Sequence, residues 1–140
     1  MKVRKYLTSQ SIASICSRFA ITPPDEFSQD WELEYCDPER TGEWVAAYES
    51  ATLDEDEKFA LMALILSSLD EAIDDGQQID ALWIRIAKLL SSDRHIHQHH
   101  IHYWCNWSAP EDEGNEGFGI THLIRSLALS SYREAKEWLS

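Results

Sequence analysis

The stretch DEDEKFALMALILSSLDEAIDD, residues 54–75, decides the fold. Its apolar side chains recur at intervals of three and four residues, which is the spacing of one helical face: Phe59, Met62, Ile65, Leu66, Leu69 and Ile73. Asp54 is suited to cap this helix, and Glu57 stands three residues later, as in a capping box. Asp75 and Gly76 form a stop signal. The stretch therefore predicts one long helix in the middle of the chain.

Upstream of this helix, the pattern predicts two more helices with a loop between them. The first has Ile12, Ile15 and Phe19 on one face and ends before Pro23-Pro24, because proline interrupts a helix. The next begins at Pro38, with Asp37 as its cap, and buries Trp44, Val45 and Tyr48. Within residues 25–37, Trp31, Leu33 and Tyr35 alternate with Glu32 and Glu34, as in a short strand or an extended loop, but no second strand is evident to pair with them. We therefore interpret them as an extended loop.

Downstream, the apolar spacing predicts two further helices. One carries Ile79, Leu82, Trp83, Ile86, Leu89 and Leu90 on its inner face. The last runs from about Thr121 to Trp138, after an acidic, glycine-rich loop at residues 109–119. No repeat and no linker divides the chain. The prediction is a single all-α domain, residues 1–140, of five or six helices in a compact orthogonal or bundle-like array.

Negative charge is concentrated in about a quarter of the chain. The net charge is −13, and residues 25–57 hold thirteen acids with Arg40 as their only base. Because nucleic acids and anionic membranes bind basic surfaces, we expect no direct contact with either. Clustered carboxylates repel one another, and they also speed encounter with a basic partner. The charge pattern therefore favours a cationic protein as the partner, although a merely solvated acidic face is the alternative.

The sequence gives no sign of catalytic machinery. Cys16, Cys36 and Cys105 have no paired spacing, and neither a phosphate loop nor a nucleophile elbow is found. We therefore expect no enzyme activity and no cofactor. The unpaired cysteines favour the reducing cytoplasm. The serine-rich N-terminal segment is typical of an amphipathic helix rather than a signal peptide, and the richest apolar run, residues 59–69, is too short to span a bilayer.

Five histidines fall within eight residues: His95, His97, His99, His100 and His102. At helical spacing His95, His99 and His102 share one face, which makes a His-rich metal-binding protein one alternative function. No H-E-x-x-H motif and no acid at helical spacing accompanies them. We therefore favour a structural interpretation, in which these three are solvated and His100 is half-buried among aromatic residues, and we assign no metal ligand.

The aromatic residues near the C-terminus carry a resemblance. Tyr103-Trp104 and Trp107 precede the acidic loop, and Phe118, Ile120-Thr121 and Ile124-Arg125 follow its glycines. Together with the run from Trp44 to Met62, this texture resembles small acidic helical immunity proteins encoded beside bacterial polymorphic toxins, including those of contact-dependent growth inhibition. The likeness covers roughly residues 30–130 and is not a defined motif.

The resemblance implies a cytoplasmic protein that binds and neutralises one cognate toxin domain, most simply a basic nuclease-type toxin. Carboxylates interleaved with aromatic anchors would suit such an interface. The predicted partner-binding residues lie in two acidic segments: Asp25, Glu26, Asp30, Trp31, Glu32, Glu34, Tyr35, Asp37, Glu111, Asp112, Glu113 and Glu116. Besides the metal-binding alternative, a general helical protein-interaction adaptor fits the same composition.

Overall fold

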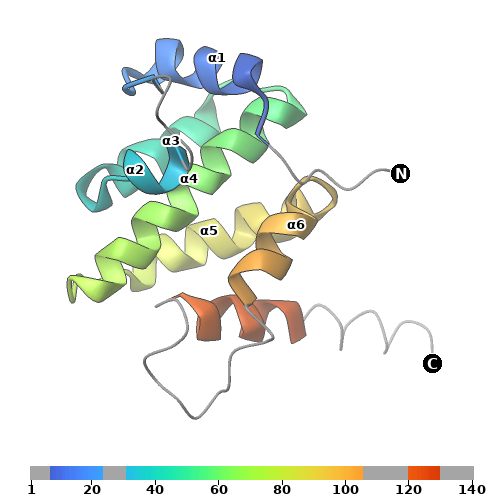
Figure 1. The fold of residues 1–140 in the computed structure, drawn as a ribbon. Helices are drawn as coiled ribbons and strands as arrows, with labels where there is room; N and C mark the ends of the chain where they lie inside the picture. The colour runs from blue at the N-terminus through green and yellow to red at the C-terminus, as the bar shows by residue number, and fades with distance from the viewer. Residues whose placement is uncertain (1–6, 24–30, 106–119, 130–140) are drawn as a thin grey trace.

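Helix α4, Glu55–Asp74, runs through the middle of the computed structural model, which describes residues 7–23, 31–105 and 120–129 (Figure 1). Residues 121–129 form a further helical segment beside α6. The other labelled elements are α1 (Ser9–Phe19), α2 (Trp31–Glu34), the 3₁₀ turn η1 (Pro38–Arg40), α3 (Thr41–Ser50), α5 (Asp80–Ser92) and α6 (Arg94–Cys105). Within the described ranges no strand is present, and the predicted all-α class is confirmed.

Helix α4 is buried on nearly every side between residues 59 and 69. Leu61 and Leu64, which fall outside the predicted stripe, are as fully buried as Met62 and Ile65. The cause is that α1, α2, η1, α3 and α6 all pack against this helix, whereas α5 packs on α3 and α6. A helix that is apolar all round belongs at the centre of a core. Each fully buried leucine or isoleucine contributes about 1.5–3 kcal/mol through its removal from water.

The N-terminus of α4 has the predicted capping box. The backbone N–H of Glu57 donates to Asp54 Oδ1 at 2.7 Å, and the Asp54 N–H donates to Glu57 Oε1 at 3.1 Å. The other oxygen of Glu57 accepts from Ser14 Oγ at 2.6 Å and from Arg18 Nη1 at 2.9 Å. One carboxylate therefore closes the first turn of α4 and fastens α1 across it.

Substitution of Asp54 by Ala is expected to lower the free energy of unfolding by about 1 kcal/mol, because one N–H in the first turn of α4 loses its acceptor. Asp54→Asn is the matched control, since an asparagine cap supplies the same side-chain oxygen and should stay close to the native value. Urea denaturation of the three proteins measures the effect. Equal losses in both variants would show that the charge of Asp54, and not its capping bond, is what stabilises α4.

The segment before Pro38 corrects the sequence prediction. Residues 31–34 are the short helix α2 rather than part of a loop. Trp31 is 3 % exposed, and its Nε1–H donates to the carbonyl oxygen of Thr22 at 3.1 Å. Burial of this indole and packing of α2 on α4 outweigh the alternating pattern, which by itself is typical of extended chain. The following cap is as predicted, since Asp37 accepts from the Glu39 N–H at 3.0 Å and Pro38 opens η1.

The remaining helices follow the predicted faces. Trp44, Val45 and Tyr48 are buried on α3, and Ile86 and Leu90 are buried on α5. Ile120 and Ile124 are buried at the start of the last helical segment. The rest of the predicted last helix, up to Trp138, and the loop at 109–119 lie outside the described residues. Within the described part of the chain, no helix is both long and apolar enough to cross a membrane.

Candidate partner-binding site at the acidic corner

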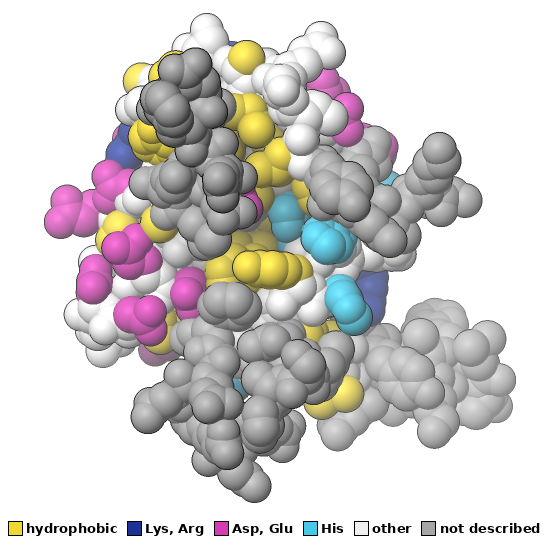
Figure 2. All heavy atoms as spheres, viewed as in Figure 1, with side chains coloured by type: hydrophobic (Ala, Val, Ile, Leu, Met, Phe, Trp, Pro, Cys, Tyr) yellow, Lys and Arg dark blue, Asp and Glu magenta, His cyan; other side chains and the backbone are white. Residues whose placement is uncertain are grey.

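Exposed carboxylates gather where the C-terminal end of α4 meets α2 and η1. We call this group the acidic corner, and it consists of Glu32, Glu39, Glu71, Asp74 and Asp75. All are exposed except Glu32, which is half-buried on α2. Figure 2 shows Asp and Glu side chains gathered over α2 and this end of α4, at the left of the view. Two acidic segments that are more than thirty residues apart in the sequence thus form one surface.

Two hydrogen bonds hold the segment before η1 against the last turns of α4. The Asp37 N–H donates to Ser68 Oγ at 3.0 Å, and the Cys36 thiol donates to Glu71 Oε2 at 2.9 Å. Burial, and then the neighbouring Glu71 carboxylate, raise the pKa of Cys36 to about 12. The thiol is therefore a neutral hydrogen-bond donor to Glu71 at neutral pH.

The position of these acids on α4 is unfavourable for stability. Glu71 and Asp74 lie in the last turn of the helix, Asp75 is its C-cap residue, and this turn has no basic residue. The C-terminus of a helix carries partial negative charge, so each carboxylate there costs about 0.3–1 kcal/mol. Mutual repulsion adds to that cost. A surface that lowers the stability of its own helix is a candidate for a function other than folding.

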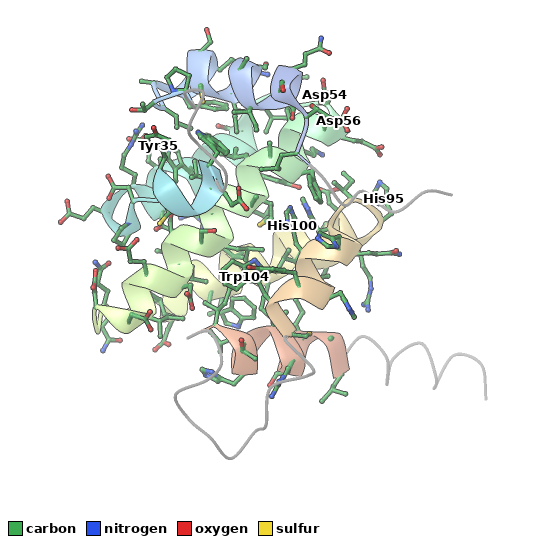
Figure 3. The ribbon with its side chains drawn as sticks, viewed as in Figure 1. Tyr35, Asp54, Asp56, His95, His100 and Trp104 are labelled. Carbon is green, nitrogen blue, oxygen red and sulfur yellow. The ribbon has the colours of Figure 1, made fainter. Side chains whose placement is uncertain are left out.

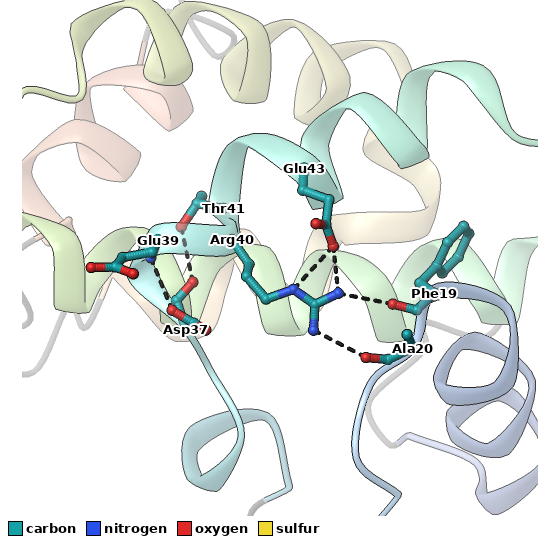
Figure 4. A network of polar contacts seen from close by, with 7 residues as sticks. All are labelled: Phe19, Ala20, Asp37, Glu39, Arg40, Thr41 and Glu43. Atoms are coloured by element: carbon teal, nitrogen blue, oxygen red, sulfur yellow. Dashed lines mark hydrogen bonds and ion pairs between the residues drawn. The ribbon is translucent and has the colours of Figure 1, made fainter.

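Arg40, the single base among residues 25–57, is turned away from the acidic corner. Figure 4 shows its guanidinium donating to the carbonyl oxygens of Phe19 and Ala20, at 2.9 and 3.1 Å, and to the Glu43 carboxylate. Its carbon Cζ also lies 4.9 Å from the centroid of the Trp44 ring. Arg40 therefore joins the end of α1 to α3, and its positive charge is paired with the Glu43 carboxylate.

Three other described bases also pair elsewhere. Arg18 binds Glu57, Lys58 lies 3.4 Å from Asp93, and Arg85 binds Glu49. The Arg85 guanidinium lowers the pKa of Glu49. These ion pairs connect α1 to α4, α4 to the start of α6, and α3 to α5. The bases stabilise contacts between helices, while the acidic corner keeps its strong negative charge.

The structure separates the predicted partner-binding residues into four groups. Glu32 lies in the acidic corner, Tyr35 is half-buried beside it, and Asp37 caps η1. Trp31 is a core residue, so its predicted role as a surface anchor is wrong. For Glu34 only the helical backbone in α2 is described. The others lie outside the described residues: Asp25, Glu26, Asp30, Glu111, Asp112, Glu113 and Glu116.

Sequence reasoning missed the α4 part of the acidic corner. Glu71, Asp74 and Asp75 lie after the densest acidic stretch, and we interpreted Asp75 only as a helix stop. The available signal was a final helical turn with several acids and no base, which reverses the usual preference for lysine and arginine at this end. At the other end of α4, Glu57 forms the capping box and Glu55 lies 3.1 Å from His95. Acids there have structural roles.

His97 belongs to a buried polar network between α6 and α3, and Figure 3 shows two other histidines of α6, His95 and His100. The helix is interrupted at His97, whose ring is fully buried. The Tyr48 hydroxyl donates to Asp93 Oδ2 at 2.7 Å, and its oxygen lies 2.7 Å from His97 Nε2, which is then the protonated nitrogen. Burial, followed by the effect of Asp93, raises the pKa of Tyr48, so the hydroxyl stays neutral. The network ties α3 to α6.

His100 is buried and not half-buried as predicted. Its ring stacks on Phe59 with the centroids 4.0 Å apart, and its Nε2 donates to the Phe59 carbonyl oxygen at 2.8 Å. Burial lowers the pKa of His100 to about 4. His95 and His102 are exposed, as expected. Across residues 7–23, 31–105 and 120–129, no three histidine, cysteine or acidic side chains are grouped to hold a metal ion.

Comparison of the chain with known proteins identified no relative. No protein-family model matches the chain, and no similar curated protein or solved structure was found. The resemblance to immunity proteins accordingly stays a prediction from the residues. The acidic corner is characterised by its own charge and geometry alone.

Proposed function

We propose that this chain is an immunity-type inhibitor, a cytoplasmic protein that binds a basic toxin domain stoichiometrically and blocks it without catalysis. The observation that carries the proposal is the acidic corner. Four of its five carboxylates are exposed, and Glu71, Asp74 and Asp75 lie at the helix end that disfavours them. The bases Arg18, Arg40, Lys58 and Arg85 are engaged in other contacts. Binding of a cationic surface would relieve the repulsion among these carboxylates. The stability that the free protein loses to this repulsion would then be regained in the complex.

Electrostatic steering explains why such a surface suits an inhibitor of a toxin. A negative patch that meets a positive one raises association rates far above the values for neutral partners. Nucleases hold phosphates with basic clefts, and an acidic surface can occupy or cover such a cleft. Speed matters in this setting, because a toxin must be captured before it acts on its target.

The residues beside the acidic corner offer a means to slow release. Tyr35 is half-buried against the core and directly precedes Cys36, whose thiol binds Glu71. Part of its ring is therefore available for contact, and tyrosine is among the residues that most often dominate binding energy at interfaces. Trp31 does not share this role, since it holds α2 in place from within the core.

Co-purification with the product of the gene immediately upstream tests the proposed function. We expect a complex of one copy of each protein at low salt, with its formation slowed as salt is added, because screening shortens the reach of the acidic corner. The control is the same experiment with the Glu71→Gln/Asp74→Asn/Asp75→Asn variant, which should associate more slowly. An upstream gene without a toxin domain, together with no basic protein retained at low salt, would overturn the proposal.

A further inference from the structure

A shallow groove lies between α6 and the helical residues 121–129, next to each other in Figure 1. It has a volume of about 210 Å³. Its lining consists of Arg94, Gln98, Ile101, His102, Cys105 and Ala128. This volume is below that of a pocket for a drug-sized ligand or cofactor, so the groove fits a group of side-chain size.

The groove has polar donors along one side and an apolar floor. Arg94, Gln98 and His102 follow one another at four-residue intervals on α6, with Arg94 before the interruption at His97 and the other two after it. Ile101, Cys105 and Ala128 supply the apolar surface. The Arg125 Nε–H donates to the Cys105 carbonyl oxygen at 2.6 Å and so fastens the 121–129 segment to the end of α6. The two walls are thereby held at a fixed separation.

The donors in this groove are unused. Arg94, Gln98 and His102 form no side-chain hydrogen bond or ion pair with the chain that the structure describes. All three side chains are exposed, so their donors are accessible to a ligand. An arginine guanidinium is a planar fork of donors that matches a carboxylate, and it is satisfied best by two parallel hydrogen bonds.

We propose that the groove binds a carboxylate carried on a short apolar stem, whether a free organic acid or an acidic side chain of a protein. Arg94 grips the carboxylate, Gln98 and His102 donate from the same face of α6, and the stem packs on Ile101 and Ala128. Burial raises the pKa of Cys105, so its thiol stays neutral and does not repel the anion. This site takes charge of the opposite sign to the acidic corner, and it does not rest on the proposed function.

Two probes test the groove and distinguish the sources of the carboxylate. Butyrate represents a free acid, and the blocked peptide Ala-Ala-Glu-Ala-Ala represents a protein side chain. We expect saturable NMR shifts of the His102 imidazole and the Ala128 methyl group with one or both. The probe that saturates at the lower concentration identifies the source. The peptide with Gln in place of Glu should give no saturable shift, because it lacks the charge that Arg94 recognises.

The variant Arg94→Gln should weaken binding of the better probe about tenfold or more, since a charge-assisted hydrogen bond is worth about 1.5–3 kcal/mol. Lys88→Gln is the matched control, because Lys88 is an exposed base on α5 outside the groove, and it should leave the affinity unchanged. The proposal is overturned if neither acid saturates, if the Gln peptide shifts the same resonances equally, or if Lys88→Gln weakens binding as much as Arg94→Gln.

Discussion

Lowering the pH from 7 to 4 should remove about 3 kcal/mol from the free energy of unfolding through His100 alone. The pKa of this side chain is 6.5 in an exposed setting and about 4 in the folded protein, where burial disfavours the charged ring. The unfolded chain therefore binds the proton first. The stability contributed by neutral His100 is complete above pH 6.5 and is lost progressively as the pH falls towards 4.

Urea denaturation at pH 7, 5.5 and 4 measures this loss, and His100→Gln supplies the control. Glutamine keeps an N–H that can donate to the Phe59 carbonyl oxygen, but it has no proton to gain in this range. The variant should be less stable at pH 7, because it lacks the stacking on Phe59, and its stability should change less between pH 7 and 4. His97 stacks on His100 with the ring centroids 5.5 Å apart, and His99 directly precedes His100 in the chain. Both residues are present in the native protein and in the variant.

Parallel pH profiles for the native protein and His100→Gln would contradict this account of α6. The lowered pKa of Glu57 produces a separate loss, which is confined to pH values below about 4.5 because a depressed carboxyl pKa stabilises the fold only while the group is ionised. Since Glu57 is present in both proteins, subtraction of one profile from the other isolates His100.

Neutralising the acidic corner should stabilise the free protein and slow its capture of a basic partner. In Glu71→Gln/Asp74→Asn/Asp75→Asn, each lost charge relieves about 0.3–1 kcal/mol of unfavourable interaction with the C-terminus of α4, and the mutual repulsion falls as well. The association rate at low salt should fall about tenfold or more, because steering depends on the removed field. Thermal unfolding measures the first effect, and stopped-flow mixing with the proposed basic partner measures the second.

Asp75 and Asp80 form a matched pair for the stability part of this prediction. Both are exposed in the connection between α4 and α5, but Asp75 caps the C-terminus of α4 whereas Asp80 lies in the first turn of α5. Asp75→Asn should raise stability and Asp80→Asn should lower it, each by about 0.3–1 kcal/mol, since the helix dipole has opposite signs at the two places. Changes of the same sign would show that the helix ends do not govern these energies.

Local patterns were enough to predict much of the fold. The capping box at Asp54, the Asp37-Pro38 start and the Gly76 stop each depend on residues within a few positions of one another, and the structure confirms all three. Helix α2 was missed because four residues cannot form a stable helix by themselves. Its conformation follows from the burial of Trp31 against the core, which is a tertiary effect.

The candidate site was only partly predictable for the same reason. The sequence shows where acids are dense, but not which of them the fold uses. The Glu57 carboxylate is engaged by the capping box and by Arg18. Glu71 accepts a hydrogen bond from the Cys36 thiol, and this contact depends on the packing of α4 against the segment before η1. Burial of His97 and His100 likewise depends on where α3 and α4 lie. The sequence pattern assigned no position to His97, whose buried ring contacts the Tyr48 hydroxyl at the interruption of α6.

The central claim is that the carboxylates of the acidic corner attract a cationic protein through their field. The most direct test is the salt dependence of the association rate between the proposed basic partner and either the native chain or the Glu71→Gln/Asp74→Asn/Asp75→Asn variant. We predict a large difference at low salt that disappears at high salt, where screening removes steering from both proteins. Equal rates at low salt, or a difference that salt does not diminish, would contradict the claim.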